Sequence, residues 1–246
     1  MEHARPVGGR AHGGRTTTAF HLTLEEAPIT DTPGPRPVEL PPLPDSPAAR
    51  RAVEVVFDNE IESLANHSVR SYLFSMIALE SQLDAVSEED QELLFFASVL
   101  HDMGTTDLLR GEPRFELQGA DFAADFLQKG GFSEARIDKA WEAISLHTTP
   151  EVPFRRGAVS RLMVQGVYMD FGFGTDPVSD ELAAALFERY PRLDLAKSFV
   201  GRIVEQVEQT PAKGPRYSMA GELHREHLAN GITELEQAAL QARWGS

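Results

Sequence analysis

The sequence predicts an all-α protein, and three observations support this fold class. From Ser46 onward, apolar residues recur at intervals of three and four, the period of an amphipathic helix. Prolines and glycines fall between these periodic segments, where helices begin and end. No segment alternates apolar and polar residues strongly enough to compete as a β-strand. We therefore expect a helical bundle over residues 46–246, long enough to form one catalytic domain with a sizeable core.

Residues 1–45 differ from the rest of the chain in composition. They hold many of its prolines and glycines and show little helical periodicity. Such a segment buries too little apolar surface to fold by itself, so we expect a mostly irregular, flexible N-terminal arm. Within it, residues 16–24 (TTTAFHLTL) are a candidate for one short strand.

Four helices are expected in the first half of the domain. The first covers residues 46–65 and has a proline at its first helical position, where the missing N–H costs nothing. The second covers about 67–82. The third covers about 87–103, and Ser87 begins it with an approximate capping box. The fourth covers about 118–129 and ends at a pair of glycines.

Six more helices are expected in the second half of the domain. Ser133 is the expected cap of the first, and prolines end two of the others. The expected ranges are about 134–148, 157–171, 180–190, 193–209, 220–230 and 232–243.

The charge balance limits the function classes. Lysine and arginine number 23 against 38 aspartates and glutamates, which gives a net charge of −15. Such a surface repels phosphate backbones, so we expect a small-molecule substrate and no nucleic-acid partner. No run of about 18 uncharged apolar residues is present, and the N-terminus lacks the apolar core of a signal peptide. We therefore expect a cytoplasmic protein without a membrane partner, and the sequence leaves open whether copies form a homo-oligomer.

The dipeptide His101-Asp102, at the end of an apolar helix (FFASVLHDMG), is the sharpest chemical feature. Because the chain has no cysteine, histidine, aspartate and glutamate are its only plausible metal ligands. Both side chains can reach one ion only if the helix end faces the centre of a bundle. The alternative interpretation is a surface or capping pair at a helix end.

Two further residues extend this pair to a possible ligand set. His67 opens a helix upstream, and Asp170 lies downstream among mostly apolar residues (VQGVYMDFG). A carboxylate buried in such surroundings needs a cation. The order His67, His101-Asp102, Asp170 is therefore a plausible set from three helices for one divalent metal. Two imidazoles and two carboxylates suit Zn(II), our first choice, as well as Fe(II), Mn(II), Co(II) or Ni(II).

Several short motifs lie between about residues 44 and 173. They are NHSVRSY at 66–72, LHDMGTT at 100–106, Phe115-Glu116, residues 144–147 and Asp170. In these motifs the chain resembles the HD-domain superfamily, and within it the cyanamide hydratase group. The resemblance implies an HD-domain helical bundle with one divalent metal in its centre, held by His67, His101, Asp102 and Asp170. It also implies a hydro-lyase that adds metal-activated water to a small nitrile such as cyanamide, which gives urea.

Two details favour a hydratase over the phosphohydrolases that dominate the superfamily. Many phosphohydrolase members share a lysine soon after the His-Asp pair. In this chain Thr105 and Thr106 occupy that stretch. Binuclear members have two more histidines before the last aspartate, and this chain has only His147. The first alternative is a phosphohydrolase acting on a nucleotide or other phosphoester, which would need the nearby Arg70, Arg110 or Arg114 at its metal. The second is a binding module without turnover, which the complete ligand set disfavours.

The resemblance also suggests catalytic roles for residues outside the ligand set. His147 is the expected general acid or substrate-orienting residue, and the alternative is a helix-end histidine that complements the helix dipole. Asp102 is the expected acceptor of the water proton, with Asp170 as the alternative, and Thr105 completes the predicted catalytic set. The expected substrate-binding residues are Phe115, Glu116, Arg70 and Thr106. Three of these residues have another interpretation. Phe115 could be a core residue, Glu116 a solvated charge, and Arg70 the partner of a ligand carboxylate.

Overall fold

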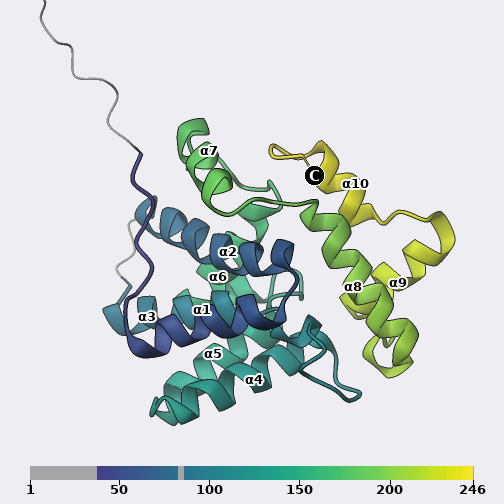
Figure 1. Ribbon diagram of the computed structural model, residues 1–246, viewed down its shortest axis with the longest axis horizontal. Coiled ribbons are helices and arrows are strands. Elements are labelled where there is room, and N and C mark those ends of the chain that lie inside the picture. The colour runs from purple at the N-terminus through teal and green to yellow at the C-terminus, as the bar shows by residue number, and fades with distance from the viewer. Residues whose placement is uncertain (1–37, 83–85, 246) are drawn as a thin grey trace, which may run out of the picture. The chain divides into compact units, whose positions relative to one another are not determined.

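The computed structural model describes residues 38–82 and 86–245. Over these residues the chain forms ten α-helices and three short 3-10 turns, with no strand. Figure 1 shows how the helices are arranged. The predicted all-α class is therefore confirmed. Residues 1–37 of the expected arm, which include the candidate strand at 16–24, lie outside the described residues. In the rest of the expected arm, Leu40 and Leu43 pack against the helical core.

The helix bounds follow the expected segments within a few residues at most ends. In chain order the elements are α1 (Pro47–Asn59), α2 (Glu62–Glu80), α3 (Glu88–Leu100), η1 (Met103–Thr105), α4 (Phe115–Lys129), α5 (Glu134–Leu146), η2 (Pro153–Arg155), α6 (Ala158–Asp170), α7 (Asp180–Arg189), α8 (Leu195–Gln209), η3 (Pro211–Lys213), α9 (Met219–Asn230) and α10 (Glu234–Gln241).

The first two helices meet earlier than expected. Glu60 and Ile61 both have extended backbone, which ends α1 and starts α2. The buried Glu60 side chain accepts a hydrogen bond of 3.1 Å from the hydroxyl of Ser68. The break expected between residues 65 and 67 was therefore wrong, because no glycine or proline marks the real one. As a result His67 lies inside α2 and does not open a helix.

Helix α3 ends three residues before the expected position. Its N-terminus is capped as predicted, since the Ser87 hydroxyl accepts from the backbone N–H of Asp90 at 3.1 Å. The last helical residue is Leu100, and His101 is the C-cap. Asp102 is the N-cap residue of the turn η1, so the His-Asp pair lies where the helix ends.

Two contacts between elements are so close that they require glycine. A Cβ on Gly166 of α6 would lie 2.0 Å from the carbonyl oxygen of Ser71 on α2. A Cβ on Gly104 in η1 would lie 1.8 Å from the carbonyl oxygen of Phe115 at the start of α4. These glycines bring α2 against α6 and bring the turn after α3 against α4.

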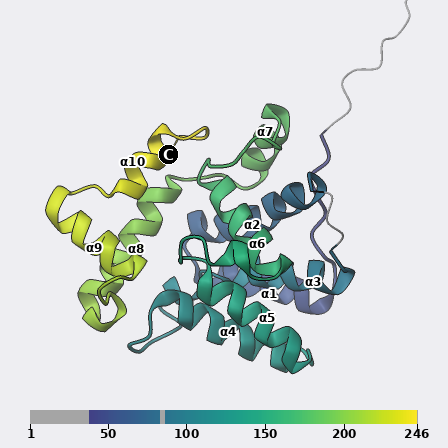
Figure 2. The ribbon, with the colours of Figure 1, turned by 180° about the vertical axis from the view of Figure 1, so that it is seen from behind.

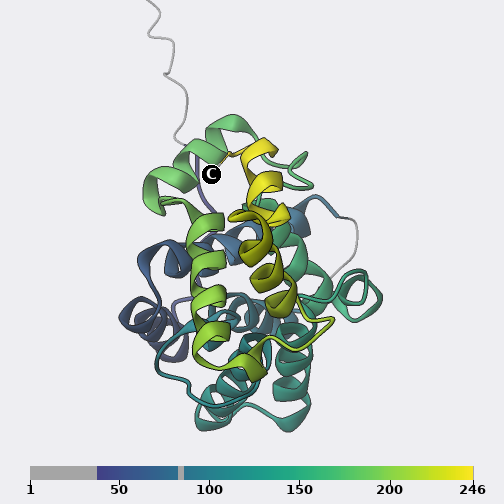
Figure 3. The same ribbon diagram turned by 90° about the vertical axis from the view of Figure 1, so that its right-hand side faces the viewer.

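The helices form two hydrophobic clusters. The larger one is built from α1 to α7, with α4 and α5 packed against each other as seen in Figure 2. The smaller one centres on α8, which packs against α9 and α10, and Figure 3 shows α8 beside α9. Phe115, Phe171 and Phe199 belong to the smaller cluster. Phe171 also lies against the ring of His67, with 5.3 Å between ring centroids, so the candidate site lies where the two clusters meet. None of the described helices is both long enough and apolar enough to span a membrane.

Candidate metal centre

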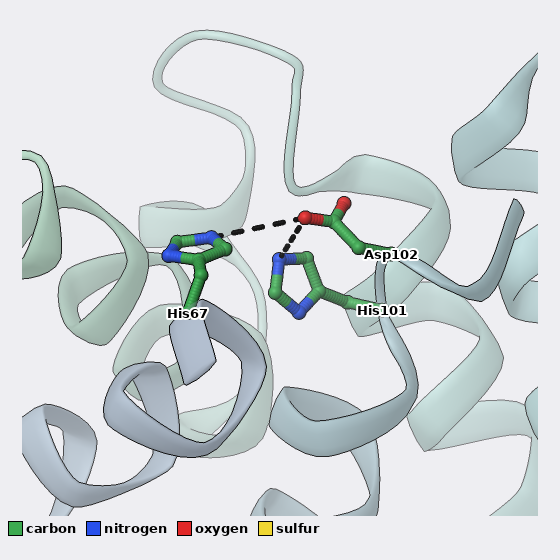
Figure 4. Close-up of side chains that lie close together, drawn as sticks. All are labelled: His67, His101 and Asp102. Carbon is green, nitrogen blue, oxygen red and sulfur yellow. Dashed lines mark ion pairs between the residues drawn. The ribbon is translucent and has the colours of Figure 1, made fainter. Parts of the chain in front are cut away.

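Three predicted ligands come together inside the bundle. His67 comes from the middle of α2, while His101 and Asp102 come from the end of α3, and Figure 4 shows the three side chains facing one another. One potential ligand atom from each lies within 4.8 Å of the others. Oδ2 of Asp102 is 3.2 Å from Nε2 of His101 and 3.8 Å from Nε2 of His67. All three side chains are buried, so this group is a candidate metal centre.

The two histidines are oriented by bonds at their other ring nitrogen. Nδ1 of His67 donates to Oδ2 of Asp170 at 2.7 Å. Nδ1 of His101 donates to the carbonyl oxygen of Ser98 at 2.7 Å, which can only accept. In its neutral form, each ring therefore presents an unprotonated Nε2 to Asp102. This is how proteins commonly fix the tautomer of a metal-binding histidine.

Asp102 has the properties of a carboxylate that lacks its cation. Within the described residues neither Oδ1 nor Oδ2 has a hydrogen-bond partner, although both atoms are buried. An isolated buried carboxylate is strongly disfavoured. Its side chain does not cap η1 either, so the alternative of a surface or capping pair does not describe this residue. The two facing imidazole nitrogens and the bare carboxylate fit a divalent metal.

Burial and neighbouring charges shift the pKa values in this group. Burial pushes the pKa of Asp102 upward, but His101 and His67 outweigh it and lower that pKa to about 2. Burial lowers the pKa of His67, which keeps its ring neutral. Burial also acts to lower the pKa of His101, but the Asp102 carboxylate prevails and raises it. A proton and a metal ion would therefore compete for the space between His101 and Asp102.

Asp170 is also buried, but its surroundings are the opposite of those of Asp102. Arg70 donates to it with Nε and one terminal nitrogen, at 2.7 and 2.8 Å. Arg192 lies 3.4 Å from its Oδ1. Burial would raise the pKa of Asp170, but Arg70 and His67 lower it far more. Asp170 thus lies outside the group of three and reaches it through His67, and Arg70 is the partner of this carboxylate.

His147 lies at the end of α5, beside the candidate centre. Its Nδ1 donates to the carbonyl oxygen of Ile144 at 2.6 Å, the same helix-end arrangement as in His101. Its ring lies edge-on to that of His101, with 5.0 Å between centroids. Burial and then His101 lower the pKa of His147 to about 4. The ring is therefore neutral near pH 7 and presents Nε2 as an acceptor.

The predicted pocket residues lie in two places. Phe115 contacts the His147 ring at 5.8 Å between centroids, and Glu116 is almost fully buried with Arg114 3.1 Å away. Burial raises the pKa of Glu116. Thr105 and Thr106 are buried in η1 and at its end, and their hydroxyls donate to backbone carbonyls of the same turn at 2.8 and 2.7 Å.

Sequence reasoning missed several residues that build the site. Arg192, far along the chain, donates to the backbone carbonyl of Asp170, and the amide of Asn66 donates to the carbonyl oxygen of Pro191 at 3.0 Å. Asn66 itself lies within α2. The sequence held one signal of the close packing around Asp170. It is the glycine in VQGVYMDFG, which interrupts an apolar helix four residues before Asp170.

Comparison with known proteins supports a relation to cyanamide hydratases. The chain is 26% identical over 209 residues to cyanamide hydratase DDI2 of Saccharomyces cerevisiae, which covers 82% of this chain and 90% of that protein. The similarity to cyanamide hydratase DDI3 of the same organism has the same identity and coverage. No protein-family model matches the chain. The predicted relation to the cyanamide hydratase group therefore has support, whereas membership of the HD-domain superfamily stays a prediction.

Proposed function

We propose that this protein is an HD-domain metal-dependent hydro-lyase that adds water to a small nitrile such as cyanamide and forms urea. The observation that carries the proposal is Asp102, a buried carboxylate with no hydrogen-bond partner among the described residues and two imidazole nitrogens beside it. The similarity to two yeast cyanamide hydratases supports the choice of reaction.

The proposed metal ligands are Nε2 of His67, Nε2 of His101 and a carboxylate oxygen of Asp102. These residues would hold a divalent metal, which would lower the pKa of water and so supply hydroxide near neutral pH. Zn(II) is our first choice for two imidazoles and a carboxylate without thiolates, and Fe(II), Mn(II), Co(II) and Ni(II) also suit these donors. For Asp170, which the sequence predicts as a further ligand, we propose instead that it supports His67, because its carboxylate accepts from Nδ1 of His67 and from Arg70.

The residues around the centre are suited to moving the protons of a hydration. One water is added across the C≡N bond, so a hydroxyl goes to carbon, a proton goes to nitrogen, and no group leaves. With Nδ1–H bound to Ile144, neutral His147 offers Nε2 as a proton acceptor. Glu116 has the raised pKa of a buried acid, and its Oε2 has no hydrogen-bond partner in the described chain. We therefore propose His147 as the base, in place of Asp102, which we propose as a metal ligand. Glu116 is the proposed donor to the nitrile nitrogen, with Phe115 excluding water beside them.

Two of the three arginines that a phosphohydrolase would need, Arg70 and Arg114, are already bound to other groups in the part of the chain that the structure describes. Arg70 is fully buried and is held by Asp170 and by the carbonyl oxygens of Tyr190 and Pro191. Arg114 pairs with Glu116. Thr105 and Thr106 offer hydroxyls that are already bonded to backbone. This arrangement favours an uncharged substrate over a phosphoester.

The test is a metal analysis coupled to an assay for urea released from cyanamide, both on the same sample purified without affinity-tag metals. We expect about one metal per chain and urea formation. Asp102→Ala should abolish both while the helical circular dichroism is retained, and replacement of the exposed Asp138 by alanine should change neither. Metal without urea would overturn the reaction but leave the centre, whereas full metal occupancy in Asp102→Ala would overturn the centre itself.

A further inference from the structure

A polar cavity of about 380 Å³ has none of the three candidate ligands in its lining. One side is formed by the segment after η1, including Thr106 and Arg110. The other side is formed by the end of α8 and by η3, including Gln209 and Lys213. This volume is in the range of pockets that hold a small metabolite.

Lys213 is the unusual residue of this cavity. Only 5% of its surface is exposed, yet within the described chain no carboxylate pairs with it. Its Nζ donates to Oε1 of Gln118. The orientation of that amide is fixed, because its Nε2 donates to the carbonyl oxygen of Arg110 at 3.0 Å. An ammonium has three N–H donors, so two of those on Lys213 remain for another acceptor.

The charged residues around the cavity also leave the Lys213 ammonium without a negative partner. Burial and then the neighbouring Arg202 lower the pKa of Lys213, as expected for a cation without a counter-charge. The acidic residue at the rim, Asp107, is already paired with Arg202 at 3.0 Å. Arg110 also lines the cavity, is exposed and has no ion-pair partner in the part of the chain that the structure describes. The cavity is thus basic in a chain of net charge −15.

A purely structural role does not account for Lys213. A lysine just beyond a helix commonly donates to the last carbonyl groups of that helix. Here Nζ is bonded to the side chain of Gln118 on α4, not to a carbonyl of α8. Burying the ammonium without a carboxylate is unfavourable, and an anion in the adjoining cavity would supply the missing partner.

We propose that this cavity binds a small molecule through a phosphate or carboxylate group, with Lys213 and Arg110 as its cationic contacts. The ligand is distinct from the uncharged substrate proposed for the metal centre, and the proposal does not depend on that function. The cavity does adjoin the centre, since Gln206 lines it and donates to the carbonyl oxygen of Gly104 at 2.9 Å.

The experiment is isothermal titration calorimetry of the metal-loaded full chain with inorganic phosphate and, separately, with acetate at constant ionic strength. The variant Lys213→Met keeps the aliphatic stem and removes the charge. Lys197→Met removes one charge from an exposed site on α8 and serves as the matched control. Loss of a charged hydrogen bond should weaken binding by about tenfold or more, and the stronger of the two probes identifies the group that the site prefers.

Three results would overturn the proposal. The first is that neither probe binds the unaltered chain at millimolar concentration. The second is that Lys197→Met weakens binding as much as Lys213→Met, which would show that only the net charge of the chain affects binding. Unchanged binding in Lys213→Met would place the anion elsewhere, for example on the metal. If Lys213→Met fails to fold, Arg110→Gln at the exposed wall decides instead, and we expect severalfold weaker binding from it.

Discussion

The two buried aspartates beside His67 differ in how their oxygens are satisfied. Asp170 receives hydrogen bonds from His67 and from two nitrogens of Arg70, and Arg192 lies against it. Asp102 is as deeply buried, yet neither of its oxygens has a hydrogen-bond partner among the described residues. The same imidazole faces both, with Nδ1 toward one and Nε2 toward the other.

This difference indicates that Asp170 supports the fold, whereas Asp102 is available to bind a cation. A buried carboxylate with matched donors is held in place and in turn holds its cations. A buried carboxylate without donors is stable only when something else brings positive charge. The half of the site around Asp170 therefore fixes the direction of His67, and the half around Asp102 is left for the metal.

The largest expected effect follows from removing the satisfied carboxylate. Asp170→Ala leaves the fully buried Arg70 without its counter-charge, so we expect a loss of about 3–5 kcal/mol in the free energy of unfolding of the metal-free protein. Asp102→Ala removes a carboxylate that has no hydrogen-bond partner among the described residues, so we expect a smaller loss than from Asp170→Ala. Urea denaturation of both metal-free variants measures the difference. Equal losses would contradict the assignment of different roles to the two aspartates.

The next effect is a pH dependence that arises on the Asp102 side. His147 has a pKa of about 4 in the folded protein, against 6.5 for the ordinary side chain. The unfolded chain therefore binds this proton first, and the folded state loses stability as the pH falls from about 6.5 toward about 4, by on the order of 3 kcal/mol.

His147→Gln tests this effect because it keeps a polar side chain but cannot titrate. His101, whose pKa is raised, acts in the opposite direction and stabilises the fold at low pH, but it is present in both proteins. We expect the unfolding free energy of the metal-free variant to fall less steeply over this pH range than that of the unaltered chain. Parallel curves in denaturant titrations at several pH values would show that His147 is not the source.

A smaller effect is expected from the helix crossing that positions Asp170. In Gly166→Ala the new Cβ would meet the carbonyl oxygen of Ser71 at 2.0 Å, so α6 has to shift away from α2. We expect a loss of about 1–3 kcal/mol in thermal or chemical unfolding and weaker metal binding, because His67 loses its support. Gly201→Ala in α8 is the matched control, since a Cβ there meets no atom within 4 Å. If both variants behave alike, close packing at Gly166 does not position the site.

Much of the fold could be predicted from the sequence, because helices depend on neighbours along the chain. Apolar periodicity located all ten described helices, and Ser87 capped α3 as expected. The ends were less certain where no glycine or proline marks them. The break at Glu60 depends on burial of its carboxyl group and on a hydrogen bond from Ser68, neither of which leaves a local signal.

The residues of the candidate site could be predicted from the sequence, but their different roles could not. The sequence by itself determined which groups can bind a metal, since a chain without cysteine offers only histidines and carboxylates, and the His-Asp pair ends an apolar helix. Only the tertiary structure decided that Asp170 is satisfied and Asp102 is not. The partner of Asp170 stands 100 residues away in Arg70. Whether a buried carboxylate keeps a free oxygen depends on such distant donors, and local sequence carries no information about them.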